Sequence, residues 1–139
     1  ALSDVERESI RLHIFTSDPS ILKKELIGSP IEQSVIVNSY VSFLEFLNLT
    51  VKFDCLIVND AETKSNKSIN PYLPSKLSDY MGSGSKIWGI CEEGSSLSNT
   101  ILDYKSELND VQAIIQTFND LLLKEINNNG GRFNEKKHR

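Results

Sequence analysis

Short apolar runs alternate along the chain with amphipathic segments of helical spacing. The runs at residues 11–16, 34–38, 55–58 and 87–91 are rich in β-branched and aromatic residues, which is typical of strands. They are mostly continuous rather than alternating, as strands covered on both faces require. The pattern therefore predicts an α/β fold in which helices cover both faces of a parallel sheet.

Capping residues indicate where two of the helices begin. Asp18 followed by Pro19 predicts a helix start, because aspartate accepts free amide hydrogens and proline suits the first helical position. That helix is expected to end near Gly28. Ser42 and Glu45 have capping-box spacing and predict a second helix that continues through residue 47.

The two ends of the chain are also expected to be helical. A capping-box pair near the start predicts a short helix over residues 4–9. Apolar positions keep helical spacing across residues 110–126, and the Asn- and Gly-rich run at residues 127–131 is expected to end this last helix. Residues 131–139 are expected to form a flexible tail.

Length and charge limit the class of protein. A chain of 139 residues suits one domain, and its net charge of −4 argues against a general nucleic-acid binder. Cys55 and Cys91 lie in apolar runs, without the spacing of a metal site, so two buried, reduced thiols in neighbouring strands of a cytoplasmic protein are expected. No metal is predicted. Because Ala1 opens the chain inside an expected helix without a methionine, a fragment of a longer protein is favoured.

The segment at residues 70–84 is the most informative part of the chain, because it lies between two predicted strands. Pro74 suits the first turn of a helix. The amides of Ser75, Lys76 and Leu77 would then lack partners within the helix and lie at the positive end of its dipole. Such a terminus, with a lysine beside it, predicts phosphate binding.

Plain structural interpretations of these residues stay open. Lys76 is equally consistent with a solvated surface lysine, and Asp79 with a polar residue on a helix surface. Gly82 and Gly84 suit the turn from helix to strand. Glu92, after the following strand, suits a polar turn.

Residues 73–84, the next strand and residues 92–95 together resemble the donor-site signature of GT-B retaining glycosyltransferases of the group 1 type. Bacterial members read close to P-S-K-L-x-E-Y-L-x-x-G, then a strand, then E-G-S. The resemblance covers residues 55–96. It implies that residues 1–130 form the Rossmann-like, nucleotide-sugar-binding half of a GT-B fold, followed by the tail at 131–139.

The resemblance also implies roles for single residues. The backbone around Ser75, Lys76 and Leu77 would face the diphosphate of a nucleotide sugar. Asp79 aligns with the second conserved acidic residue of the family, which hydrogen-bonds the ribose hydroxyls. A carboxylate suits this role because it accepts from two neighbouring hydroxyls at once.

One departure from the family pattern concerns the sugar. The first conserved glutamate of the family, which usually contacts the donor sugar, falls on Pro71 here. Asn70 or Tyr72 is therefore expected to take its place. Ser95 is expected to approach the donor.

The function implied is transfer of a hexose from a nucleotide-diphosphate sugar to a bacterial cell-envelope glycan or a related, lipid-linked acceptor. The nucleotide sugar is the donor substrate, and no further cofactor is implied. The acceptor would bind a missing N-terminal domain, and the family's leaving-group cations would precede this chain, so catalytic residues are unassigned and the fragment alone is expected to be inactive. Peripheral membrane association of the full-length protein is compatible with the resemblance.

Three alternatives remain. The first is a non-catalytic Rossmann-like or flavodoxin-like binding or regulatory module. A phosphorelay receiver would need a phosphoacceptor aspartate, for which Asp60 and Asp18 are the nearest candidates. A degenerate transferase half used for protein contacts is favoured by the missing glutamate.

Overall fold

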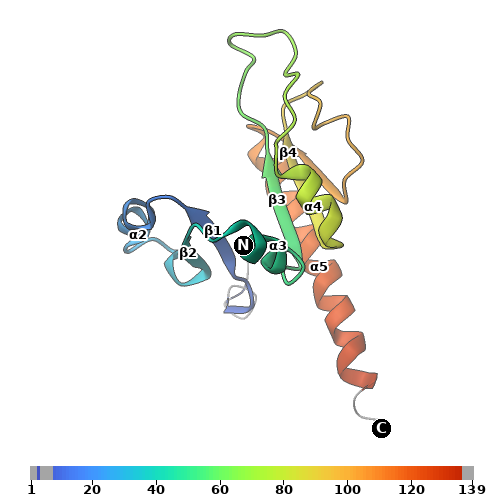
Figure 1. Ribbon diagram of the computed structural model, residues 1–139. Coiled ribbons are helices and arrows are strands. Elements are labelled where there is room, and N and C mark those ends of the chain that lie inside the picture. Colours follow the sequence, from blue (N-terminus) through green and yellow to red (C-terminus); the bar gives the residue numbers. More distant parts are fainter. Residues whose placement is uncertain (1–2, 4–7, 136–139) are drawn as a thin grey trace. The chain divides into compact units, whose positions relative to one another are not determined.

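The computed structural model describes residue 3 and residues 8–135, which group into two compact units, residues 1–46 and 47–139. Each unit is considered by itself. The described part contains two parallel sheets and four α-helices, consistent with a Rossmann-like α/β fold (Figure 1). The predicted fold class is therefore confirmed.

The first unit is a βαβ segment. Its elements are β1 (Leu12–Thr16), α2 (Pro19–Leu26), the short 3-10 helix η1 (Glu32–Ser34) and β2 (Val35–Ser39). The two strands pair in parallel with Leu12 opposite Val35. As predicted, Asp18 caps α2, accepting the Ser20 N–H at 3.1 Å, and Gly28 follows the helix with a φ of 75°.

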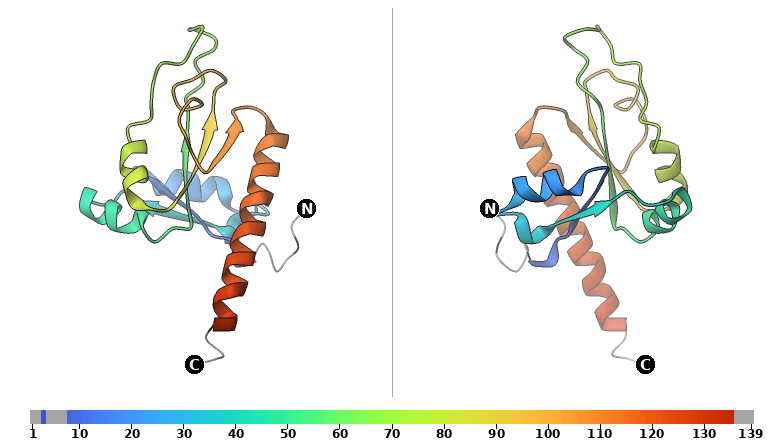
Figure 2. Two further views of the ribbon diagram at one scale, coloured as in Figure 1. Left: turned by 90° about the vertical axis from the view of Figure 1, so that its right-hand side faces the viewer. Right: turned by 60° about the vertical axis from the view of Figure 1, so that its left-hand side comes forward.

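The second unit is a three-stranded parallel sheet with strand order β3-β4-β5. Its elements are β3 (Cys55–Asn59), α4 (Leu77–Ser83), β4 (Lys86–Cys91), β5 (Tyr104–Glu107) and α5 (Val111–Glu135). The helix α3 (Phe43–Thr50) begins in the last residues of the first unit. Helices α4 and α5 lie on opposite faces of the sheet (Figure 2, left).

A different cluster of side chains fills each face of this sheet. On the α4 face, the buried residues are Val58, Leu77, Ile87, Cys91 and Leu97, with Tyr80 and Leu102 packed against them. On the α5 face, Trp88 stacks on Phe118 with ring centroids 6.4 Å apart, and its indole N–H donates to the Ser106 hydroxyl. Both helices are therefore packed against the sheet by buried residues of β4.

Several predicted boundaries differ from the structure. Helix α4 begins at Leu77 rather than Pro74, and Pro74 instead starts a turn. Strand β5 was not predicted, and α5 continues to Glu135, past the run at 127–131 that was expected to end it. Most of the helix expected at residues 4–9 lies outside the described residues, as do residues 136–139 of the expected tail.

The two cysteines lie in neighbouring strands, as predicted, and both are free thiols. Cys91 is buried in β4, whereas Cys55 is only half-buried in β3. Burial raises the pKa of Cys55 to about 12 and the pKa of Cys91 to about 11. Both side chains therefore remain protonated at neutral pH.

Gly89 in β4 leaves room for the core. A Cβ atom at this position would lie 2.5 Å from Leu102 Cδ1 and 3.1 Å from Cys91 Sγ. We expect Gly89→Ala to lower the free energy of unfolding by about 1–3 kcal/mol, because the added methyl group overpacks the α4 face. Urea denaturation measures the loss.

Gly82→Ala is the matched control for this change. Gly82 lies in α4, and a Cβ atom there would meet nothing within 4 Å. Alanine should therefore stabilise the helix by about 0.5–1 kcal/mol. Equal effects of the two substitutions would contradict the close packing at Gly89.

Candidate functional site

The carboxyl ends of β3 and β4 lie at one edge of the parallel sheet. Two segments leave this edge: the long loop (residues 60–76), which leads to α4, and the turn after β4 (residues 92–99). The long loop extends well beyond the strand ends (Figure 1). Ligands of open α/β sheets bind at this edge, so the two segments form the candidate site.

Asp60, directly after β3, connects the two segments. The residue is 3% exposed, and its N–H donates to the Ile90 carbonyl at 2.9 Å. Its Oδ2 accepts the Glu92 N–H at 2.8 Å and the Ser95 hydroxyl at 2.6 Å. The carboxylate therefore fixes the start of the turn after β4 against the start of the long loop.

Glu92, directly after β4, makes the reciprocal connection. The residue is 3% exposed, and its Oε1 accepts the N–H groups of Thr63 and Lys64 at 3.0 and 2.8 Å. Its Oε2 accepts the Thr63 hydroxyl at 2.7 Å. These hydrogen bonds, the hydroxyl foremost, lower the pKa of Glu92.

The returning part of the long loop is joined to the same turn. The Ser96 N–H donates to the Asn70 carbonyl at 3.2 Å, and the Ser96 hydroxyl donates to the Pro71 carbonyl at 3.1 Å. The Asn70 side chain is buried, accepting the Tyr72 N–H and donating to the Ala61 carbonyl, both at 3.1 Å. Both parts of the loop are thus fixed at the sheet edge.

Three of the residues predicted to contact the nucleotide sugar instead form hydrogen bonds within the protein. Asn70 has the bonds just described, and Ser95 is fully buried, with its hydroxyl on Asp60. The Leu77 side chain is 1% exposed in the core, and its amide, expected to face a diphosphate, donates to the Pro74 carbonyl at 3.0 Å. These three residues therefore already have partners within the protein.

The other predicted contacts lie nearer the surface. Ser75 and Lys76 are exposed in the turn that precedes α4, and Asp79 is half-buried in the first turn of that helix. Tyr72 is exposed, and its hydroxyl accepts a hydrogen bond from Lys67 Nζ, which lowers the pKa of Tyr72.

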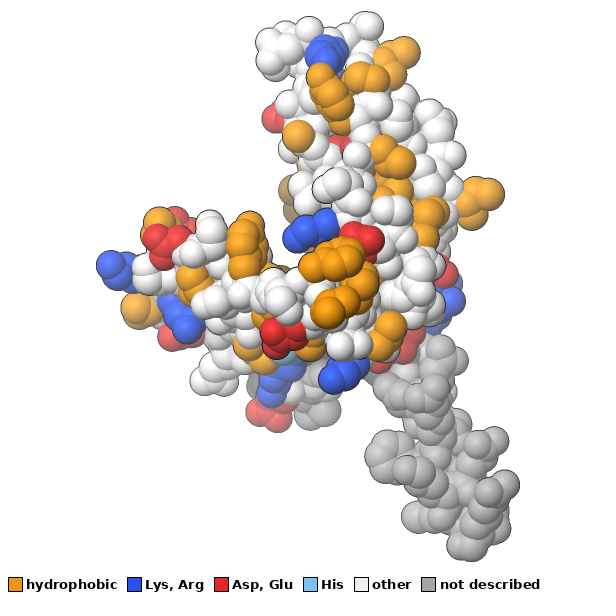
Figure 3. Space-filling view, viewed as in Figure 1, with side chains coloured by type: hydrophobic (Ala, Val, Ile, Leu, Met, Phe, Trp, Pro, Cys, Tyr) orange, Lys and Arg blue, Asp and Glu red, His pale blue; other side chains and the backbone are white. Residues whose placement is uncertain are grey.

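Hydrophobic and basic side chains of the long loop are visible on the surface in Figure 3.

Sequence reasoning did not find the paired roles of Asp60 and Glu92. Asp60 was weighed only as a phosphoacceptor, and Glu92 only as part of a polar turn. Glu92 directly follows a predicted strand, Asp60 lies two residues after the end of another, and parallel strands end at one edge. Their placement after neighbouring strands was the signal that could have predicted two carboxylates close together.

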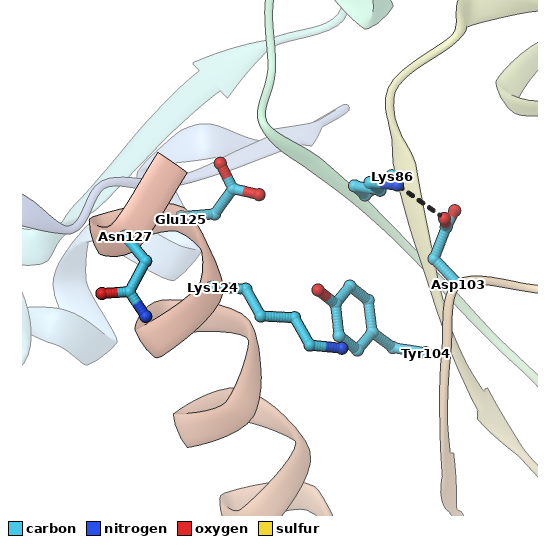
Figure 4. A pocket seen from close by; sticks show the side chains of 6 residues that line it. All are labelled: Lys86, Asp103, Tyr104, Lys124, Glu125 and Asn127. Carbon is cyan, nitrogen blue, oxygen red and sulfur yellow. Dashed lines mark hydrogen bonds and ion pairs between the residues drawn. The ribbon is translucent and has the colours of Figure 1, made fainter. Parts of the chain in front are cut away.

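A polar pocket of about 320 Å³ lies at the opposite edge of the sheet, beside α5 (Figure 4). It is lined by Lys86, Asp103, Tyr104, Lys124, Glu125 and Asn127. Lys86 and Asp103 form an ion pair at 3.1 Å, and Lys124 Nζ lies 5.1 Å from the centre of the Tyr104 ring. Its charges are therefore balanced within the lining, and none of the predicted site residues reaches it.

The described residues contain neither a candidate membrane span nor a candidate metal site. No helix in them is both long and apolar enough to cross a membrane. Within the same residues, no group of three or more His, Cys, Asp or Glu side chains is placed to hold a metal ion. Comparison with protein-family models, curated proteins and solved structures finds no match for this chain.

Proposed function

We propose that the chain binds the nucleotide-diphosphate sugar of a glycosyltransferase at the carboxyl edge of β3 and β4. One observation carries the proposal. The hydrogen bonds from Ser96, directly after the second part of the signature, to the backbone of Asn70 and Pro71, just before the first part, bring the two parts to the same edge of the sheet. A donor-binding site requires the start of the first part to lie beside the second part, as these bonds place it.

The exposed residues of the edge suit this ligand. Lys76 would supply positive charge to the diphosphate, and the Ser75 hydroxyl a hydrogen-bond donor. Asp79 would accept hydrogen bonds from the ribose hydroxyls. The acceptor glycan would bind a separate domain, and catalysis in such a pair of domains depends on positioning and on stabilising the leaving phosphate.

Titration with UDP, GDP and inorganic phosphate tests the proposal. We expect both nucleotides to shift the backbone NMR signals of residues 75–79, and phosphate to shift them less. Lys76→Ala should weaken UDP binding by about tenfold, as expected for the loss of one charge-assisted bond. The isolated chain is expected to bind without transferring sugar.

Lys52→Ala is the matched control. Lys52 is an exposed lysine of the same unit, and it lies before the amino end of β3, at the opposite edge of the sheet. If both lysine variants weaken binding equally, the attraction is general rather than local. If no nucleotide shifts residues 75–79, the donor-binding proposal is wrong and a non-catalytic module is favoured.

A further inference from the structure

We propose that Glu92 is a positioning residue, whose carboxylate orders the long loop so that the Lys76 turn is presented to a diphosphate. The effect on binding rests on the proposed function. The effect on loop order does not, because it follows from the hydrogen bonds of Glu92 alone. The two effects can therefore be measured separately.

The Glu92 carboxylate is hydrogen-bonded to the outgoing part of the long loop. Thr63 and Lys64 lie early in the long loop, and together they give the carboxylate three hydrogen bonds. The returning part of the loop is joined to the same turn after β4 by the hydrogen bonds from Ser96 to Asn70 and Pro71. Glu92 thus fixes the outgoing part of the loop to the turn that also holds the returning part.

The tip of the long loop is exposed. Much of the segment between Thr63 and Asn70 is turn or bend, and residues 64–69 are all exposed. A segment with few buried apolar contacts opens at low free-energy cost. The order of the segment between Thr63 and Asn70 therefore depends on the hydrogen bonds at its two ends, and those of Thr63 and Lys64 go to Glu92.

A carboxylate suits position 92. It offers only acceptors, and every group that it meets here is a donor. Alanine would leave the Thr63 and Lys64 amides without this partner. Glutamine keeps one acceptor oxygen for the two amides, and the Thr63 hydroxyl can turn to accept a hydrogen bond from the glutamine NH2 group. Glu92→Gln should therefore keep part of the hydrogen bonding that Glu92→Ala loses.

Acid should weaken the same contact. Because the pKa of folded Glu92 is lowered, its stabilising contribution is fully present above the unfolded pKa and is lost as the pH falls through the folded pKa. Three other charged groups lie near it: Asp60 on its N–H, and the exposed pair of Lys64 and Glu93. All three groups are also present in Glu92→Gln, so the difference between the two proteins isolates Glu92.

Amide hydrogen exchange tests loop order in the chain without ligand. We expect exchange at Thr63 and Lys64 to rise by about tenfold or more in Glu92→Ala and by less in Glu92→Gln, while amides within β4 stay protected. On acidification, the Thr63 and Lys64 amides should lose protection from exchange in the natural chain as Glu92 takes up a proton. The loss due to Glu92 should be absent in Glu92→Gln. UDP affinity should fall by about tenfold in Glu92→Ala, because the turn is no longer pre-organised.

Glu93→Ala is the matched control. Glu93 is the next residue, its side chain is 79% exposed, and its only described ion pair, with Lys64, is at 3.7 Å. We expect it to leave both exchange and UDP affinity unchanged. Should Glu92→Ala fail to fold, Thr63→Val removes one hydroxyl donor from the same carboxylate and should raise exchange at Lys64 by about threefold.

The outcomes separate the two ideas. Unchanged exchange in Glu92→Ala, or equal loss in Glu93→Ala, would overturn the ordering role. Faster exchange with unchanged UDP affinity would overturn the positioning role. If the natural chain binds no UDP, the proposed function fails together with the positioning role, while the exchange data still decide whether Glu92 orders the loop.

Discussion

Replacing Trp88 with alanine is expected to lower the free energy of unfolding by about 3–5 kcal/mol, as is usual when a buried aromatic residue is truncated. Trp88 is 4% exposed at the centre of the sheet and stacks on Phe118 of α5. Its removal opens a cavity between β4 and α5 and leaves the Ser106 hydroxyl without its indole donor. Urea denaturation followed by far-ultraviolet circular dichroism measures the change.

Trp88→Phe separates packing from hydrogen bonding. The smaller ring still meets Phe118 but has no N–H for Ser106, so a loss of about 1–2 kcal/mol is expected. This variant also keeps the comparison measurable if the alanine variant is largely unfolded. A loss below about 1 kcal/mol in Trp88→Ala would contradict the packing of α5 on this face.

Replacing Asp60 with alanine is expected to lower the free energy of unfolding by about 3 kcal/mol. Hydrogen bonds to charged groups are strong, and their loss leaves buried donors unpaired. The Glu92 N–H and the Ser95 hydroxyl would both lose their acceptor in a buried place. The turn after β4 should therefore lose its attachment to the end of β3. Urea denaturation measures the cost, and amide exchange at Glu92 locates it.

Asp54→Ala is the matched control for Asp60. Asp54 precedes β3 as Asp60 follows it, but its side chain is exposed. We expect a change within about 0.5 kcal/mol, as for most surface substitutions. A similar cost at both positions would show that Asp60 acts through general charge rather than through its buried hydrogen bonds.

The elements with strong local signals were predictable. Asp18 and Pro19 begin α2 as expected, and the Ser42 hydroxyl accepts the Glu45 N–H at 3.4 Å in the predicted capping box. The continuous apolar runs became β1 to β4. In each case residues adjacent in the chain decide the outcome, so the sequence alone carries the information.

The elements that depend on tertiary contacts were not predictable. Strand β5 is short and has one buried residue, Ser106, so it lacks an apolar run and forms because β4 supplies its hydrogen bonds. Helix α4 starts late because the Leu77 amide bonds to Pro74 within a turn. Backbone bonding within the turn took precedence over the helix-starting preference of proline.

The candidate site was predictable in place but not in detail. The loop of the motif was expected at the carboxyl edge of the sheet, and it lies there because it leads from the end of β3 to α4. The motif did not indicate that Ser95 would be buried, since its partner Asp60 lies far away along the chain, nor that Asn70 would be buried with its side chain on the backbone of the same loop. Whether Lys76 and Asp79 bind a ligand stays a prediction.

The position of Trp88 has a practical consequence. It is the single tryptophan of the chain and lies between the sheet and α5. Its fluorescence should therefore be blue-shifted while the last helix is attached, and should move to longer wavelengths when water reaches the indole ring. An unlabelled sample thus reports optically when α5 joins or leaves the sheet.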